Sequence, residues 1–247
     1  MAGHSKWANI RFRKGAQDAK RGKIFTKLIR EISVAARAGG ADESSNSRLR
    51  DAISKALKAN MKRDTIDNAI KRGVGGLDGD NMVEMRYEGY GPGGVAILVD
   101  CLSDNKNRTV SEVRHAFTKH GGNLGTDGSV AYLFNKQGEI LLVEGQAEDQ
   151  VMEIAIESGA DDVVVEEGQI EIITAAENYH AVLTAVQNAG YQIEQSHLTM
   201  RAQTMVPMDK ESAESLIKLI DMLEDLDDVQ EVHSNAELPE SLLESMA

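Results

Sequence analysis

Apolar residues recur at the spacing of one helix face in the first third of the chain. This periodicity predicts helices over 24–38 and 46–58, and a shorter third helix that ends at Gly73. The apolar faces consist of Phe25, Leu28, Ile29 and Ile32, then Leu49, Ile53, Ala56 and Leu57, then Ile66, Ala69 and Ile70. Residues 74–81 contain three glycines and no periodicity, so we expect a linker there. The pattern therefore predicts a three-helix module followed by a break.

After this linker the pattern is typical of strands. Residues 82–88 alternate, residues 89–94 are rich in glycine and predict a turn, and residues 95–101 form an apolar run that indicates a buried strand. Residues 139–200 then have the order β-α-β-β-α-β, which is the ferredoxin-like split βαβ unit. Its expected elements are a strand at 139–143, a helix at 147–158, strands at 161–166 and 169–174, a helix at 177–189 and a strand at 191–200.

The segments on either side of this unit predict a second copy of the same order. They are a strand at 94–101, a helix at 107–120 and a strand at 129–134, then a strand at 202–207, a helix at 210–226 and a strand at 229–233. We therefore predict an α+β fold: an N-terminal three-helix module plus two ferredoxin-like α+β domains, one inserted in the other. The expected domains are 1–75 (basic arm and helical domain), 82–134 plus 202–247 (a discontinuous α+β domain) and 135–201 (the inserted domain).

Charge divides the chain at the same place as the pattern. Residues 1–75 hold 18 Lys and Arg against 7 Asp and Glu, a net charge of +11, whereas the remainder holds 9 against 33, a net charge of −24. Such asymmetry favours polyanion binding by the basic part, because Lys and Arg release counterions condensed on phosphates. The alternative is that the basic surface docks onto the protein's own acidic half.

Residues 1–23 form a basic arm with few apolar positions, and we expect the arm and the first helix to contact nucleic acid. The candidate residues are His4, Lys6, Trp7, Arg11, Arg13, Lys14, Lys20, Arg21, Lys23 and Lys27. Trp7 beside Lys6 suits stacking on an unpaired base with a phosphate alongside. The alternative is that Trp7 packs on the helical module.

A second group of polar residues lies at an expected helix start. Asn105, Lys106, Asn107 and Arg108 combine amides and cations, which suits an anion at a helix N-terminus. The alternative is an Asx-type turn with a helix N-cap and no ligand.

The sequence gives no sign of an enzyme or of a cofactor. Cys101 is the single cysteine, and it ends an apolar run, so we expect a buried small side chain. The six histidines do not have metal-ligand spacing, and no catalytic signature surrounds any Ser, His or Asp. No run approaches the length of a membrane span. We expect a cytoplasmic protein without metal, cofactor or small-molecule substrate.

The opening residues 2–10, AGHSKWANI, resemble the start of the YebC family, and so do the motifs GPGGVA at 91–96, NKNRT at 105–109 and GGNLG at 121–125. The resemblance covers essentially the whole chain. It implies three domains, one inserted in another, and no established catalytic residues. The family is labelled as DNA-binding transcriptional regulators. Its mitochondrial relatives are translational activators, and bacterial members are linked to ribosomes stalled on proline runs.

These observations lead to a non-enzymatic, nucleic-acid-binding regulator of gene expression. One version binds DNA and alters transcription. The other binds ribosomal RNA, as a ribosome-associated factor that relieves stalling on proline runs. A third reading is an acidic scaffold that binds a basic protein. The family label favours DNA. The net charge of −24 after residue 75 favours RNA, because an acidic body is repelled by a long duplex.

Overall fold

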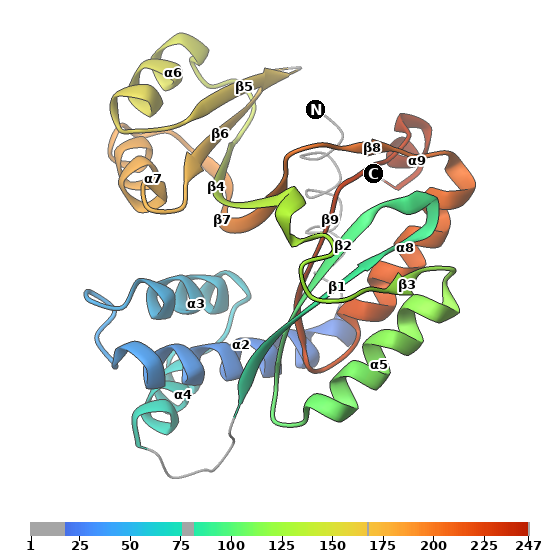
Figure 1. Cartoon of the computed structure of the whole chain (residues 1–247). Helices are drawn as coiled ribbons and strands as arrows, with labels where there is room; N and C mark the ends of the chain where they lie inside the picture. The colour runs from blue at the N-terminus through green and yellow to red at the C-terminus, as the bar shows by residue number, and fades with distance from the viewer. Residues whose placement is uncertain (1–17, 76–81, 167, 247) are drawn as a thin grey trace.

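The structure, a computed structural model, describes residues 18–75, 82–166 and 168–246 (Figure 1). Residues 18–75 form the helical module, which consists of α2 (Asp18–Gly39), α3 (Ser47–Lys58) and α4 (Arg63–Gly75). Their apolar faces meet in a core that includes Ile32, Leu49 and Ile66, each 0% exposed. The predicted three helices are therefore present. The first begins earlier than residue 24, because Ala, Lys and Arg favour helix without any apolar periodicity.

Asn46 and Gly73 hold the helices of the module close together. The buried Asn46 side chain accepts a hydrogen bond from the Leu49 backbone N–H (3.0 Å) and so caps α3. Its amide also donates to the carbonyls of Ala35 and Gly40 (both 2.8 Å), which fixes the end of α2. A Cβ on Gly73 would lie 2.3 Å from the Ser33 carbonyl oxygen, so α2 and α4 approach at a distance that only glycine allows.

The inserted domain has the order that the sequence predicted. It runs β4 (Phe134–Leu142), α6 (Glu148–Glu157), β5 (Asp162–Glu166), β6 (Gln169–Ala175), α7 (Tyr179–Asn188) and β7 (Ile193–Ala202). Its sheet has the strand order β5-β6-β4-β7, with all neighbours antiparallel, as in ferredoxin-like folds. Figure 1 shows α6 and α7 on one side of this sheet, and the core between them includes Ile140, Ile172 and Val182.

The outer domain is built from the segments that flank the inserted one. It contains β1 (Val83–Tyr90), β2 (Ala96–Ser103), α5 (Lys106–Lys119), β3 (Asn123–Leu124), β8 (Val206–Pro207), α8 (Lys210–Glu224), β9 (Val229–Ser234), β10 (Ala236–Glu237) and α9 (Glu240–Met246). The main sheet has the order β3-β1-β2-β9, and α5 and α8 share its largest core. Val113, Phe117 and Leu219 are fully buried there. The mixed α+β class that the sequence predicted is correct.

The outer domain departs from the predicted strand order in two places. The expected strand at 129–134 is a 3₁₀ turn, Ala131–Leu133, and β4 begins only at Phe134. The buried Glu88 carboxylate explains this turn, since it accepts hydrogen bonds from the backbone N–H groups of Gly128, Val130 and Ala131 at 2.7–2.8 Å. In the expected strand at 202–207, only 206–207 forms a strand of the outer domain, and it pairs with β10 outside the main sheet. Strand β1 occupies the position beside β2 in the main sheet that was expected for residues 202–207.

Candidate nucleic-acid interface

The predicted contact residues fall into two groups in the structure. His4, Lys6, Trp7, Arg11, Arg13 and Lys14 lie outside the described residues. Lys20 and Arg21 belong to α2, but their side chains are not described. Lys23 and Lys27 are described, and both lie on the face of α2 that meets the outer domain. Figure 1 shows α2 reaching from the helical module toward α8 and β9.

Three cations of α2 contact the point where α8 ends. The Lys23 amine donates to the Asp225 carbonyl oxygen (2.9 Å) and the Lys27 amine to the Glu224 carbonyl oxygen (2.6 Å). The Arg30 guanidinium donates to the Asp227 carbonyl oxygen (2.9 Å). Residues 23, 27 and 30 follow one helix face, so a single side of α2 makes all three contacts. We call these three side chains and residues 224–228 the α2–α8 clamp.

The end of α8 attracts these cations for a general reason. The last carbonyls of a helix have no partner within it, and the helix dipole places negative charge there. The sequence of residues 224–228, EDLDD, adds four carboxylates at the same point. The clamp therefore satisfies carbonyl groups and reduces repulsion among acids. The acidic run after an apolar helix was a signal in the sequence that a basic surface lies against it.

Lys27 is partly enclosed between α2 and the end of α8. Burial lowers the pKa of its amine from 10.5 to about 8, against the opposing attraction of Asp227. The neighbouring Lys23 lowers this pKa further. Part of the Lys27 population is therefore neutral at slightly alkaline pH, which is not the state expected of a lysine that faces open solvent.

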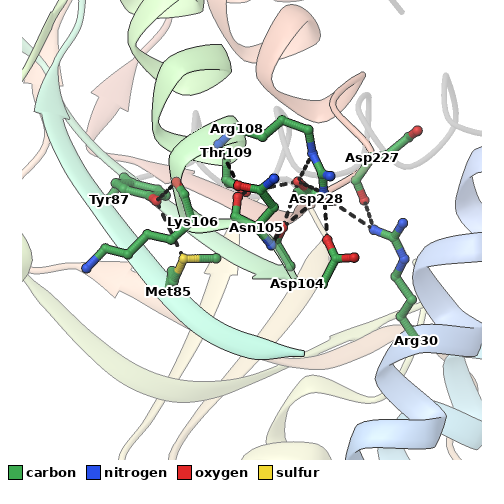
Figure 2. Close-up of polar contacts among 11 residues, drawn as sticks. Arg30, Met85, Tyr87, Asp104, Asn105, Lys106, Arg108, Thr109, Asp227 and Asp228 are labelled. Atoms are coloured by element: carbon green, nitrogen blue, oxygen red, sulfur yellow. Dashed lines mark hydrogen bonds and ion pairs between the residues drawn. The ribbon is translucent and has the colours of Figure 1, made fainter. Parts of the chain in front are cut away.

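Asp228 joins the clamp to the start of α5, as Figure 2 shows. Its side chain is 3% exposed and accepts hydrogen bonds from Ser103 Oγ (2.8 Å), Thr109 Oγ1 (2.9 Å) and Arg108 Nη2 (2.8 Å) through Oδ2. Its other oxygen accepts from Arg30 Nη1 (3.2 Å). Burial raises the pKa of Asp228, but the hydrogen bonds from Arg108, Ser103 and Thr109 outweigh it and hold the pKa below its ordinary value.

The predicted anion site lies at this same helix start. The Asn105 side chain accepts a hydrogen bond from the Arg108 backbone N–H (3.1 Å), so Asn105 is the N-cap of α5. The Arg108 guanidinium also contacts Asp104 (2.9 Å), so its charge is already matched by two carboxylates. Lys106 and Asn107 are exposed. An external anion here would have to compete with Asp104 and Asp228.

A cavity of about 520 Å³ separates α2 from the start of α5. Three cations and five carboxylates line it together with Leu226: Lys23, Arg30, Arg108, Asp104, Glu112, Asp225, Asp227 and Asp228. The charges that surround it are mixed, so its electrostatic field does not select one sign of ligand. Among the residues that the structure describes, no group of His, Cys, Asp and Glu has the arrangement of a metal site.

Most other cations of the helical module are also paired within the molecule. Arg48 contacts Glu31 and Glu84, Lys55 contacts Glu231 (2.6 Å) and Arg63 contacts Glu43 and Asp67. Lys62, Lys71 and Arg72 are exposed and have no partner among the described residues. These three belong to the basic outer faces visible in the sequence, but they were not among the predicted contact residues. The spacing of charged residues in the sequence does not show which cations are paired in the fold and which are free.

Two further sequence expectations concern single features of the chain. Cys101 is free and 3% exposed, and burial raises the pKa of its thiol to about 12. The thiol is therefore protonated and shielded from reagents at physiological pH. In the parts of the chain that the structure describes, no helix has the length and apolar composition needed to cross a membrane.

Comparison with known proteins places the chain among relatives of the same architecture. Residues 5–76 match the family description "TACO1/YebC protein N-terminal domain", and residues 82–236 match "TACO1/YebC second and third domain". A crystal structure titled as a conserved hypothetical protein from Aquifex aeolicus has a TM-score of 0.80 and 49% sequence identity, covering 90% of this chain and 93% of that one.

Curated relatives match over the full length. A "Probable transcriptional regulatory protein" of Legionella pneumophila is 80% identical over 246 residues, which is 100% of both chains. A protein with the same description from Methylococcus capsulatus is 63% identical over 244 residues, 98% of both chains. These matches agree with the three-part architecture and with the resemblance carried by the opening motif. The chain belongs to the TACO1/YebC family.

Proposed function

We propose that this protein is a non-enzymatic regulator of gene expression that binds nucleic acid through its helical module and basic arm. The observation that carries the proposal is the net charge of +11 on residues 1–75 beside −24 on the rest. Relatives described as transcriptional regulatory proteins support it, and they favour DNA as the first candidate target. Phosphate contacts of this kind supply affinity without requiring any catalytic group.

The free cations of α4 give the proposal a specific surface. Lys62, Lys71 and Arg72 are exposed and unpaired within the described chain, so no internal contact has to be broken before they meet a phosphate. The arm candidates His4, Lys6, Trp7, Arg11, Arg13 and Lys14 extend this surface in sequence. We therefore assign the first contacts to the arm and α4, and ascribe a different role to Lys23 and Lys27.

Ribosomal RNA is the second candidate target, and one observation favours it. Four carboxylates of residues 224–228 lie directly beside α2, and a long straight duplex laid along α2 would approach them. A folded RNA can present phosphates to a basic surface and still avoid an acidic neighbour. In this version the protein is a ribosome-associated factor that acts during translation.

The first prediction concerns the salt dependence of binding. Lys62→Ala, Lys71→Ala and Arg72→Ala in one variant should weaken binding of a labelled duplex or of an rRNA fragment. The slope of log affinity against log salt should fall by about 2–3, since each phosphate contact contributes about 0.7–0.9. The matched control carries Arg114→Ala, Lys119→Ala and Lys210→Ala, which removes the same charge from exposed positions of the outer domain. Fluorescence anisotropy over a salt series measures both.

The outcome separates the candidates. Equal loss in both variants would mean that only net charge matters, and absence of salt-sensitive binding would reject the proposal. Sedimentation with ribosomes that disappears after nuclease treatment would favour rRNA, whereas protection of defined duplexes would favour DNA. Association with a basic protein in the absence of nucleic acid would favour a scaffold.

A further inference from the structure

The helical module is joined to the rest of the molecule by polar contacts. Among the residues that the structure describes, its apolar core shares none with the cores of the outer and inserted domains. Within the described chain, no helix of the module packs extensively against a helix or strand of the other two domains. Contacts that bridge them among the described residues include the α2–α8 clamp, Arg48–Glu84, Lys55–Glu231, Lys58–Ser196 and His180–Asp51.

In nearly all of these contacts the module supplies the cation. The body, by which we mean the outer and inserted domains, supplies carbonyl or carboxylate oxygens in the clamp, at Glu84 and at Glu231. The pair His180–Asp51 is the exception. Ion pairs that reach solvent are individually weak and are screened by salt. Apart from Arg30, which also meets the buried Asp228, the module is held by contacts of this exposed kind, and these separate at low cost when another anion takes the place of the body.

Nucleic acid offers the same chemistry that the body offers to α2. The carbonyl and carboxylate oxygens at 224–228 occupy positions around Lys23, Lys27 and Arg30 that phosphate oxygens can also take. The two cannot occupy them together, because Asp225 and Asp227 repel a phosphate brought to the same amines. A phosphodiester chain also releases counterions on binding, which an internal carboxylate does not.

We propose that residues 224–228 act as an internal competitor for the polyanion-binding face of α2, and that nucleic acid releases the helical module from the acidic body. This inference rests on the proposed function. First contact is made by the exposed cations of α4, and the clamp then opens as Lys23, Lys27 and Arg30 exchange their carbonyl and carboxylate partners for phosphates. A ligand that is short or weakly charged does not displace residues 224–228 from α2, so the clamp stays closed.

The state of Lys27 agrees with this exchange. Enclosure by the body lowers the pKa of the Lys27 amine to about 8, and release beside a phosphate restores a higher pKa. Binding should therefore take up protons near pH 8.5. Calorimetry in two buffers of different ionisation enthalpy measures that uptake, and Lys27→Gln should abolish the part that comes from this residue.

The central experiment changes the competitor. Asp225→Asn with Asp227→Asn leaves the buried Asp228 in place and removes two charges from the clamp. Affinity of the full chain for a duplex or rRNA fragment at low salt should rise about tenfold. The control, Glu153→Gln with Glu157→Gln, removes the same charge from exposed positions of α6 and should change affinity less than about twofold. Similar gains in both variants would overturn the inference.

A second measurement follows the opening directly. A zero-length carbodiimide cross-link should join Lys23 to Asp225 (3.9 Å) and Lys55 to Glu231 (2.6 Å) in the free protein, with the products mapped by mass spectrometry. Saturating nucleic acid, added before the reagent, should prevent both cross-links if the whole helical module separates from the body. If the protein binds nucleic acid and both cross-links still form in the complex, the inference is overturned and the proposed function stands. Failure of all variants to bind would reject both.

Discussion

At the scale of single residues, Asp228 has the largest structural role in the clamp. Its buried carboxylate accepts hydrogen bonds from Arg30, Ser103, Arg108 and Thr109, which come from three separate parts of the chain. Removing one member of a buried ionic group leaves the other members without partners, and that loss exceeds what the group adds when complete. The position is therefore unlike Asp104, which contacts the same arginine at the surface.

We expect Asp228→Ala to lower the free energy of unfolding by about 3 kcal/mol, because two arginines and two hydroxyl groups lose the same buried acceptor at once. Urea denaturation at pH 7 measures the change. Asp104→Ala is the matched control, since it removes an exposed partner of the same Arg108 and should cost less than about 1 kcal/mol. Equal effects would show that the hydrogen bonds to the Asp228 carboxylate do not act together.

Lys27 gives a prediction about pH. The folded pKa of about 8 lies below the ordinary 10.5, so the unfolded chain binds more protons between these values and stability rises with pH there. Between pH 7 and 9 the free energy of unfolding should gain about 1 kcal/mol relative to Lys27→Met. The buried Cys101 has the opposite effect as the pH approaches 9.0, the ordinary pKa of its thiol, because burial raises the folded pKa to about 12. Cys101 is present in both proteins, so the difference between their curves isolates Lys27, and parallel curves would contradict the assignment.

At the scale of elements, periodicity predicted what depends on local pattern. The helices of the module and the β-α-β-β-α-β order of the inserted domain follow from apolar residues that must face a core. The turn at 131–133 did not follow, because its cause is Glu88, which lies 40 residues or more away in sequence from the groups it binds. From the sequence alone the run at 129–134 is typical of a strand, because no residue near it indicates that Glu88 will bind its backbone N–H groups.

The same limit applies to the candidate interface. The sequence indicated which residues carry charge, but the pairing of Lys23 and Lys27 with the end of α8 depends on contacts across about 200 residues of chain. For these two lysines the alternative interpretation of the sequence is correct, because both dock onto the acidic half of the protein. The remaining contact residues of the arm stay predictions, as does the anion site at Asn105, Lys106, Asn107 and Arg108.

The approach of α2 to α4 gives a prediction for one element pair. Gly73→Ala should destabilise the protein by about 2 kcal/mol or more, because the new methyl group would meet the Ser33 carbonyl at 2.3 Å and force the helices apart. Gly22→Ala is the control within α2. Its Cβ would meet nothing within 4 Å, so it should be neutral or stabilise the helix by up to about 1 kcal/mol. Thermal unfolding of both variants measures the difference.

At the scale of the whole molecule, opposite charges are distributed between parts that also fold around separate cores. The helical module and the body each bury their own apolar residues, and charge holds them together. A net charge of −13 for the whole chain conceals this arrangement. The same property that keeps the free protein closed gives it a surface that responds to polyanions, and the response requires no change within any one core.

The way in which the inserted domain is connected has a consequence of its own. The chain enters this domain at β4 and leaves it at β7, and these strands are neighbours in which Phe134 lies opposite Ala202. Entry and exit are therefore a single place in space. The inserted domain is attached through one pair of neighbouring strands. We therefore expect that another ferredoxin-like unit can replace it without displacing the two segments of the outer domain that it joins.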